Sequence, residues 1–118
     1  MTEQHLPLSD CALELIAHRF KVLSDPTRLR LLRLLMDGEL SVNELVSALQ
    51  ATQANVSKHL GILSDSGLIA RRKVGVTALY RIADPTIFTL CNIVCQSLLT
   101  RGEQTLQRLR SDDAPLES

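Results

Sequence analysis

The stretch TQANVSKHL, residues 52–60, decides the fold of this chain. Thr52 is a suitable N-cap, and Val56 and Leu60 recur at the i, i+4 spacing that turns two side chains to one face of a helix. Leu63 extends this apolar stripe by another turn. The opposite face then carries only hydrogen-bonding or cationic side chains: Gln53, Asn55, Ser57, Lys58 and His59. The stretch therefore predicts a helix with one buried face and one polar, exposed face.

Two helices are expected near the start of the chain. Ser9-Asp10 can cap a first helix that runs to about Leu23. Asp25 is a suitable N-cap for a second helix, with Pro26 at its first position, and Gly38 stops that helix. The second helix is apolar on nearly all sides, so we expect it to be central and buried.

A short helix leads directly into residues 52–60. Ser41 and Glu44 fit a capping box that opens it, because the serine caps the helix and the glutamate reaches back to the serine amide. Residues 50–51 make the turn between the two helices. A short helix, a tight turn and a polar-faced helix together predict a helix-turn-helix.

The hydrophobic period changes after this helix. Residues 68–74 and 77–82 are short, partly alternating and rich in β-prone residues, with Gly75 at the turn between them. Asp84-Pro85 then opens a last long helix, which Gly102 is expected to kink or end. The sequence thus predicts a mainly α fold with a β-hairpin wing, a winged helix-turn-helix of order α-α-α-α-β-β-α.

Length and composition are those of one small folded domain. Apolar residues make up 45% and charged residues 22% of the 118 residues, which favours a globular chain over a disordered one. We expect residues 1–110 to form this domain and residues 111–118 to be a disordered acidic tail. The chain has no apolar run long enough to span a membrane and no signal-peptide core, so we expect it to be cytoplasmic.

Positive charge is concentrated in one part of a chain whose net charge is zero. Residues 51–82 contain five cations against Asp65, a local excess of four, whereas residues 111–118 hold three carboxylates. Attraction to nucleic acid depends on the local patch more than on the total charge. The five cations are Lys58, Arg71, Arg72, Lys73 and Arg81.

Two motifs resemble the ArsR/SmtB family of bacterial winged-helix repressors. LSDPTRLR, residues 23–30, is similar to the opening of that family's second helix. VSKHL, residues 56–60, followed by Leu63 and by SGLI at 66–69, is similar to its recognition helix and the entry to its wing. The resemblance covers roughly residues 13–100 and implies a transcriptional repressor that a ligand releases from double-stranded DNA.

The polar face of residues 52–60 supplies the candidate contacts to DNA bases. Glutamine and asparagine can pair with adenine through two hydrogen bonds, and serine tolerates several partners, so Gln53, Asn55 and Ser57 are expected at base edges. Lys58 is expected at a phosphate. His59 is either a base or phosphate contact or a residue of the helix packing.

The predicted wing supplies candidate contacts to the DNA backbone or minor groove. Side chains alternate along a strand, so Arg71 and Lys73 share one face and Arg72 points to the other. The wing tip, residues 74–76, carries no charge, so deep insertion into the minor groove is not expected. Winged helices of this size usually bind palindromic sites as two-fold homodimers, and the apolar stripes of the first and last helices are candidates for the dimer interface.

The metal sites that the resemblance implies are absent from this sequence. One needs cysteines in the stretch 39–45, which contains none. The other needs histidine and carboxylate pairs on the last helix, where residues 85–110 contain no histidine and only Glu103 as a carboxylate.

Three cysteines remain as candidate sensor residues. Cys91 and Cys95 lie four residues apart, about 6 Å along a helix, and can hold a soft ion between two sulfurs. The resemblance implies that the first helix, which Cys11 opens, packs by the last helix, so three thiolates could converge and suit As(III) or Sb(III). No cofactor is otherwise required. Redox or sulfane-sulfur sensing is a second interpretation. A third is that the cysteines are small apolar residues of the dimer interface.

Catalysis is not expected. The sequence shows no paired carboxylates, glycine-rich phosphate loop or Ser-His-Asp order, and its three histidines lie on different elements. A protein-interaction module with a winged helix is the other alternative to a DNA-binding regulator, since the net charge is zero.

Overall fold

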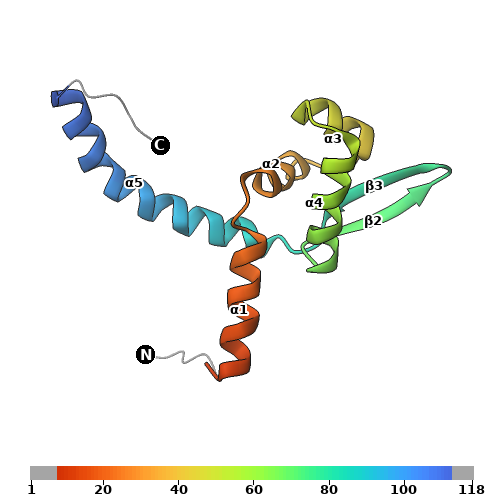
Figure 1. The fold of residues 1–118 in the computed structure, drawn as a ribbon, viewed down its shortest axis with the longest axis horizontal. Helices are drawn as coiled ribbons and strands as arrows, with labels where there is room; N and C mark the ends of the chain where they lie inside the picture. The colour runs from red at the N-terminus through yellow and green to blue at the C-terminus, as the bar shows by residue number, and fades with distance from the viewer. Residues whose placement is uncertain (1–7, 113–118) are drawn as a thin grey trace. The chain divides into compact units, whose positions relative to one another are not determined.

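The computed structural model describes residues 8–112 (Figure 1). It divides at Asp84 into two compact units, of which the first ends at Asp84 and the second begins at Pro85. The first unit contains α1 (Asp10–Val22), α2 (Pro26–Leu35), β1 (Leu40–Ser41), α3 (Val42–Leu49), α4 (Gln53–Asp65), β2 (Ile69–Val74) and β3 (Thr77–Ile82). The second contains α5 (Thr86–Asp112).

Helix caps begin four of the helices at the residues that the sequence indicates. The Ser9 hydroxyl accepts a hydrogen bond from the Ala12 amide at 3.1 Å, and the capping box of Ser41 and Glu44 is complete. Thr52 caps α4, and Asp25 caps α2 with Pro26 in its first turn. These predictions are confirmed because a cap depends only on residues within one turn of it.

A three-stranded antiparallel sheet of order β1-β3-β2 replaces the expected two-stranded hairpin. Strand β1 has two residues, and it pairs Leu40 with Tyr80 and Ser41 with Leu79. The hairpin of β2 and β3 projects beyond α4 (Figure 1). Sequence patterning missed β1 because two residues are too short to show alternation, and because the strand exists only through pairing with distant residues.

The core of the first unit is made of aliphatic side chains from α2, α3 and α4 and the start of β2. Leu31, Leu45, Leu60 and Leu63 are completely buried. The expectation that α2 is buried on nearly all sides is wrong, since Leu29 is 38% and Met36 is 53% exposed. Helix α2 therefore packs by one face and leaves another open.

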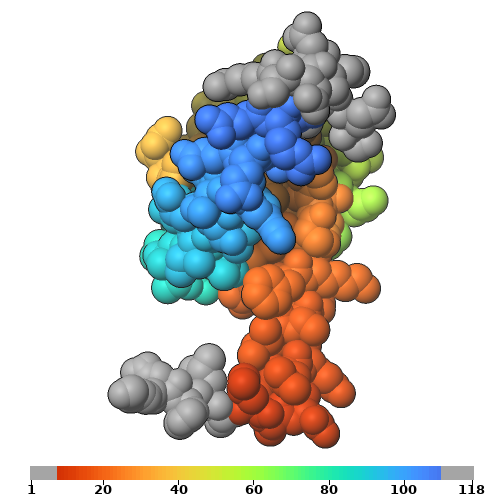
Figure 2. Space-filling model, turned by 90° about the vertical axis from the view of Figure 1, so that its left-hand side faces the viewer, coloured from red at the N-terminus to blue at the C-terminus, as the bar shows by residue number. Residues whose placement is uncertain are grey.

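Helix α1 carries apolar side chains that the first unit leaves exposed. Leu13, Leu15, Ile16 and Phe20 are all exposed, and α1 appears in red to orange in Figure 2. Its buried residue is Val22, at the end of the helix. The apolar stripe that the sequence indicates for α1 therefore exists, but it does not serve the core of this unit.

Helix α5, which forms the second unit, is one continuous helix. It passes through Gly102 and continues to Asp112, so of the two outcomes expected at this glycine, a kink or an end, the helix does not end there. A glycine inside a helix costs only about 1 kcal/mol relative to alanine, which a long helix tolerates. The exposed apolar side chains of α5 are Ile93, Val94, Leu98, Leu99 and Leu106. Residues 113–118 of the predicted acidic tail lie outside the described residues.

Candidate nucleic-acid interface

Helix α4 presents the polar face that its sequence predicts, except that His59 is buried. Gln53, Asn55, Ser57 and Lys58 are exposed. On the other side of the helix Val56, Leu60 and Leu63 are completely buried. The core thus fixes which way the helix faces, and four side chains able to contact bases or phosphates are left toward solvent.

The turn before α4 sets its position relative to α3. Gln50, at the end of α3, adopts the left-handed conformation with φ 54°, and its amide donates to the Ser47 carbonyl at 3.3 Å. Two residues later Thr52 accepts a hydrogen bond from the Asn55 amide at 3.1 Å. The two helices therefore meet through a tight turn that holds the first turn of α4 at the surface.

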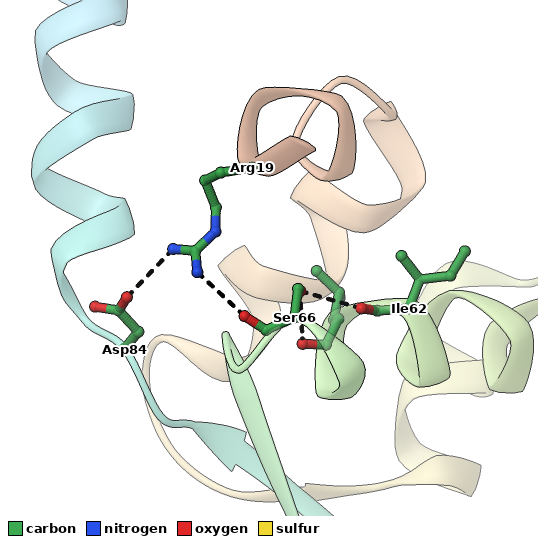
Figure 3. A network of polar contacts seen from close by, with 5 residues as sticks. Arg19, Ile62, Ser66 and Asp84 are labelled. Atoms are coloured by element: carbon green, nitrogen blue, oxygen red, sulfur yellow. Dashed lines mark hydrogen bonds and ion pairs between the residues drawn. The ribbon is translucent and has the colours of Figure 1, made fainter. Parts of the chain in front are cut away.

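The carboxyl end of α4 is held by Arg19 of α1 (Figure 3). The guanidinium of Arg19 donates to the Ser66 carbonyl at 3.1 Å and to the Asp84 carboxylate at 3.4 Å. The Ser66 hydroxyl donates back to the Ile62 and Leu63 carbonyls of the last turn. Arg19 thereby joins the end of α4 to Asp84, the last residue of the first unit.

His59 is buried on the core side of α4. Its exposed fraction is 6%, and its Nδ1 lies 3.1 Å from a terminal nitrogen of Arg28. A guanidinium only donates hydrogen bonds, so Nδ1 is the acceptor in this contact. Of the two roles that the sequence leaves open for His59, this placement fits helix packing and not a contact to DNA.

Arg28 also holds the end of α1, a role that sequence reasoning missed. Its Nε donates to the Val22 carbonyl at 2.6 Å, and a terminal nitrogen donates to the Lys21 carbonyl at 3.3 Å. The Asp25 carboxylate fixes the backbone around Arg28 by accepting hydrogen bonds from the Arg28 and Thr27 amides. Burial raises the pKa of Asp25, but these amide hydrogen bonds and the charges nearby together outweigh it, so the pKa lies below its ordinary value.

The wing carries its cations as the strand alternation predicts, although one is already paired. Arg71 and Lys73 are exposed on β2, and Val76 at the uncharged tip is 96% exposed. Arg72 instead donates two hydrogen bonds to the Glu39 carboxylate, at 2.7 and 2.8 Å. This pairing lowers the pKa of Glu39 and raises the pKa of Arg72. To contact a DNA phosphate, the Arg72 guanidinium must either bind the phosphate while still paired with Glu39 or break its hydrogen bonds to Glu39.

The Glu39–Arg72 pair leads to a testable expectation. Glu39→Gln removes the competing carboxylate, so Arg72 gains freedom to meet a phosphate, and affinity for any DNA sequence should rise several-fold. The dependence of log Kd on log salt should steepen by up to about one unit per subunit. Fluorescence anisotropy of a mixed-sequence duplex at several salt concentrations measures both quantities.

Glu14→Gln on α1 is the matched control, because it makes the same change of charge on a helix of the same unit that lies away from the wing (Figure 1). An unchanged affinity in Glu39→Gln would show that Arg72 does not approach DNA. If Arg72 causes the rise in DNA affinity, the double variant Glu39→Gln/Arg72→Gln should not show it.

The three cysteines are free thiols on two helices. Cys11 is exposed in the first turn of α1. On α5, Cys91 is half-buried and Cys95 is exposed, and their spacing of four residues places them on one side of that helix. Within residues 8–112, no group of three or more histidine, cysteine, aspartate or glutamate side chains is placed to hold a metal ion.

No helix in the described part of the chain is long and apolar enough to cross a membrane. The exposed apolar residues of α1 and α5 are interrupted by polar and charged ones.

Comparison with known proteins supports the assignment of α4 and its neighbours. Residues 25–71 match the family described as bacterial regulatory protein, arsR family. The chain is 36% identical over 100 residues, 84% of this chain and 81% of the relative, to Rv0081, an uncharacterised HTH-type transcriptional regulator of Mycobacterium tuberculosis. It is 45% identical over 65 residues to the arsenical resistance operon repressor of Escherichia coli, a match that covers 54% of this chain and 56% of that protein.

A solved structure shows the same fold. The homodimeric winged helix-turn-helix DNA-binding domain Mb0332 of Mycobacterium bovis, a possible ArsR-family regulator, superimposes with a TM-score of 0.68. It is 28% identical, and the match covers 80% of this chain and 91% of that domain. With the polar face of α4 and the basic wing, these relationships show a regulator and not an enzyme. The chain belongs to the ArsR family of winged helix-turn-helix transcriptional regulators, which bind DNA.

Proposed function

We propose that the chain is a homodimeric repressor of a palindromic operator and that a thiophilic ion bound at Cys91 and Cys95 releases it from DNA. The observation that carries the proposal is the pair of free thiols on α5, one half-buried and one exposed, at a spacing of four residues. Two sulfurs at this spacing can bridge a soft ion such as As(III) or Sb(III). Cys11, or another thiol, is needed to complete a three-sulfur site.

The homodimer rests on apolar surface that each unit leaves uncovered. Leu15 and Phe20 of α1 are 69% and 51% exposed, and Leu98 of α5 is 62% exposed. Contiguous exposed apolar side chains mark interaction surfaces. The Mycobacterium bovis relative is a homodimer. Two copies of α4 related by a two-fold axis require a palindromic DNA site.

The names of two relatives favour a thiophilic inducer. One is the arsenical resistance operon repressor of Escherichia coli, and another is the probable mercury resistance operon repressor of Streptomyces lividans, which is 38% identical over 74 residues. Arsenic and mercury both prefer thiolate ligands. Release from DNA requires the ion to bind more tightly to a form of the dimer that does not fit the operator.

A redox or sulfane-sulfur signal is the second candidate. An exposed thiol such as Cys95 is accessible to oxidants and persulfide donors. A similar structure was solved as the reduced form of HlyU from Vibrio cholerae, with a TM-score of 0.65 and 29% identity. A simple disulfide between Cys91 and Cys95 is poorly aimed within one helix, so this signal would use Cys11 or a longer sulfur bridge.

Release of the reduced protein from its own promoter DNA distinguishes these interpretations. We expect arsenite or antimonite to lower the anisotropy of labelled promoter DNA at concentrations where zinc has no effect. Cys91→Ser and Cys95→Ser should bind the DNA with wild-type affinity and lose at least tenfold in sensitivity to the ion, because each removes one of two sulfur ligands.

Cys11→Ser shows whether the third thiol takes part. Release by peroxide or a persulfide donor alone would establish the second candidate. If Cys91→Ser and Cys95→Ser leave the DNA at the same ion concentration as the wild type, the cysteines have only a structural role.

A further inference from the structure

An open pocket of about 260 Å³ lies beside the first turn of α4. Its residues come from α2, from the last turn of α3, from the turn that follows and from α4. The polar ones are Thr27, Arg30, Arg33 and Asn55, and the others are Leu34, Ala48, Leu49 and Ala51. Asn55, a candidate base contact, thus stands at the edge of a pocket that α2 supplies with two cations.

The two arginines share one side of α2. Thr27, Arg30 and Arg33 follow one another at intervals of three residues, which places them on adjacent turns of one helix face. No carboxylate lines the pocket. Within residues 8–112, the side chains of Arg30 and Arg33 have no hydrogen bond or ion pair, in contrast to those of Arg19, Arg28 and Arg72. Two exposed guanidinium groups are therefore available to an anion from outside the chain.

We propose that this pocket binds a phosphate of the DNA backbone next to the groove that α4 enters. Arginine is well suited to phosphate because its planar fork donates two parallel hydrogen bonds to two oxygens. The pocket is smaller than the about 300–1,000 Å³ typical of small-molecule sites, so it suits a single phosphate group better than an organic ligand. The partial positive charge at the start of α4 adds to the same attraction.

The position of the pocket also favours a backbone phosphate. A helix in the major groove has phosphates at the rim of that groove near its ends, and contacts to them fix its register. Asn55 belongs both to the pocket and to the exposed face of α4. Phosphate binding by Arg30 and Arg33 would therefore position the base contacts of the same helix. The inference rests on the DNA-binding function and adds α2 to the interface.

Salt dependence on a DNA of mixed sequence tests the pocket without knowledge of the operator. Each phosphate contact contributes about 0.9 to the slope of log Kd against log salt. If one contact per subunit is lost, Arg30→Gln/Arg33→Gln should reduce the slope of the dimer by about two, with weaker binding to every sequence. Lys21→Gln/Arg101→Gln removes the same charge outside the pocket and should keep the wild-type slope within about 0.5. Circular dichroism establishes that each variant is folded.

Three outcomes overturn the proposal or its basis. Equal slopes for the wild type and the pocket variant exclude a backbone phosphate here. A wild type whose binding shows no dependence on salt would contradict the DNA-binding function itself. The third concerns a free anion: inorganic phosphate at constant ionic strength raises the Tm of the wild type and not that of the pocket variant. Combined with an unchanged DNA slope, that shift would assign the pocket to a free anion.

Discussion

Arg28→Met is expected to lower the free energy of unfolding by about 2–4 kcal/mol. Methionine keeps the length of the apolar stem but removes the donors to the Val22 carbonyl, the Lys21 carbonyl and His59. Because His59 is buried, its Nδ1 then has no donor, and an unpaired buried acceptor costs about 1–3 kcal/mol by itself. Urea unfolding followed by circular dichroism measures the change.

Arg30→Met, two residues further along α2, is the matched control. Arg30 is exposed, so its replacement should change the stability by no more than about 0.5 kcal/mol. A double-mutant cycle of Arg28→Met with His59→Leu should give a coupling of at least about 0.5 kcal/mol, since the two side chains are in contact. Additive effects would mean that Arg28 stabilises the protein through α1 alone.

Local signals in the sequence predicted most of the helices and strands and the polar face of α4. The caps at Ser9, Asp25, Ser41 and Thr52 are in place because each needs only its own helix. The polar face of α4 is likewise visible in about two turns of sequence, since Val56 and Leu60 fix the opposite side. Both patterns concern residues close together in the chain.

The features that the sequence did not predict depend on partners far along the chain. Arg28 and His59 are 31 residues apart, and Arg72 and Glu39 are 33 apart. Neither pair has a spacing that periodicity can detect. The phrase LSDPTRLR drew attention to residues 23–30 as a helix start, yet it gave no sign that its two arginines differ, Arg28 bonded inward and Arg30 exposed. Side-chain roles on α2 therefore required the tertiary structure.

Two arginines connect α1 with the end and the middle of α4. Arg19 bonds to Ser66 at the end of α4, and Arg28 joins the last turn of α1 to His59 in its middle. Arg19 also bonds to Asp84, which directly precedes the second unit. A displacement of α1, or of the segment at Asp84, would therefore strain contacts that hold α4. Under the proposed function this connection provides a physical route from dimer geometry to the DNA-contacting helix.

Asn55→Ala and Ser57→Ala are expected to weaken specific binding much more than binding to unrelated DNA. Asparagine can form two hydrogen bonds with adenine, and a good pair of this kind discriminates against the wrong base by about 1–3 kcal/mol. A homodimer uses the residue once in each half-site, so Asn55→Ala should lose about 2–6 kcal/mol of specificity. Ser57→Ala should lose less, because a hydroxyl accepts several partners. Selection of binding sites from random duplexes, followed by titration of the best and of an unrelated sequence, measures the ratio.

Lys58→Ala serves as the comparison on the same helix face. A lysine that contacts phosphate contributes to all sequences alike, so this variant should reduce the salt slope and leave the ratio of specific to non-specific affinity unchanged. Equal losses on both DNAs for Asn55→Ala would remove that residue from the base contacts. Because Asn55 also lines the pocket of Arg30 and Arg33, a combined loss of slope and specificity would mean that it serves phosphate and base together. The two effects can be separated, since only the base contact depends on the sequence of the duplex.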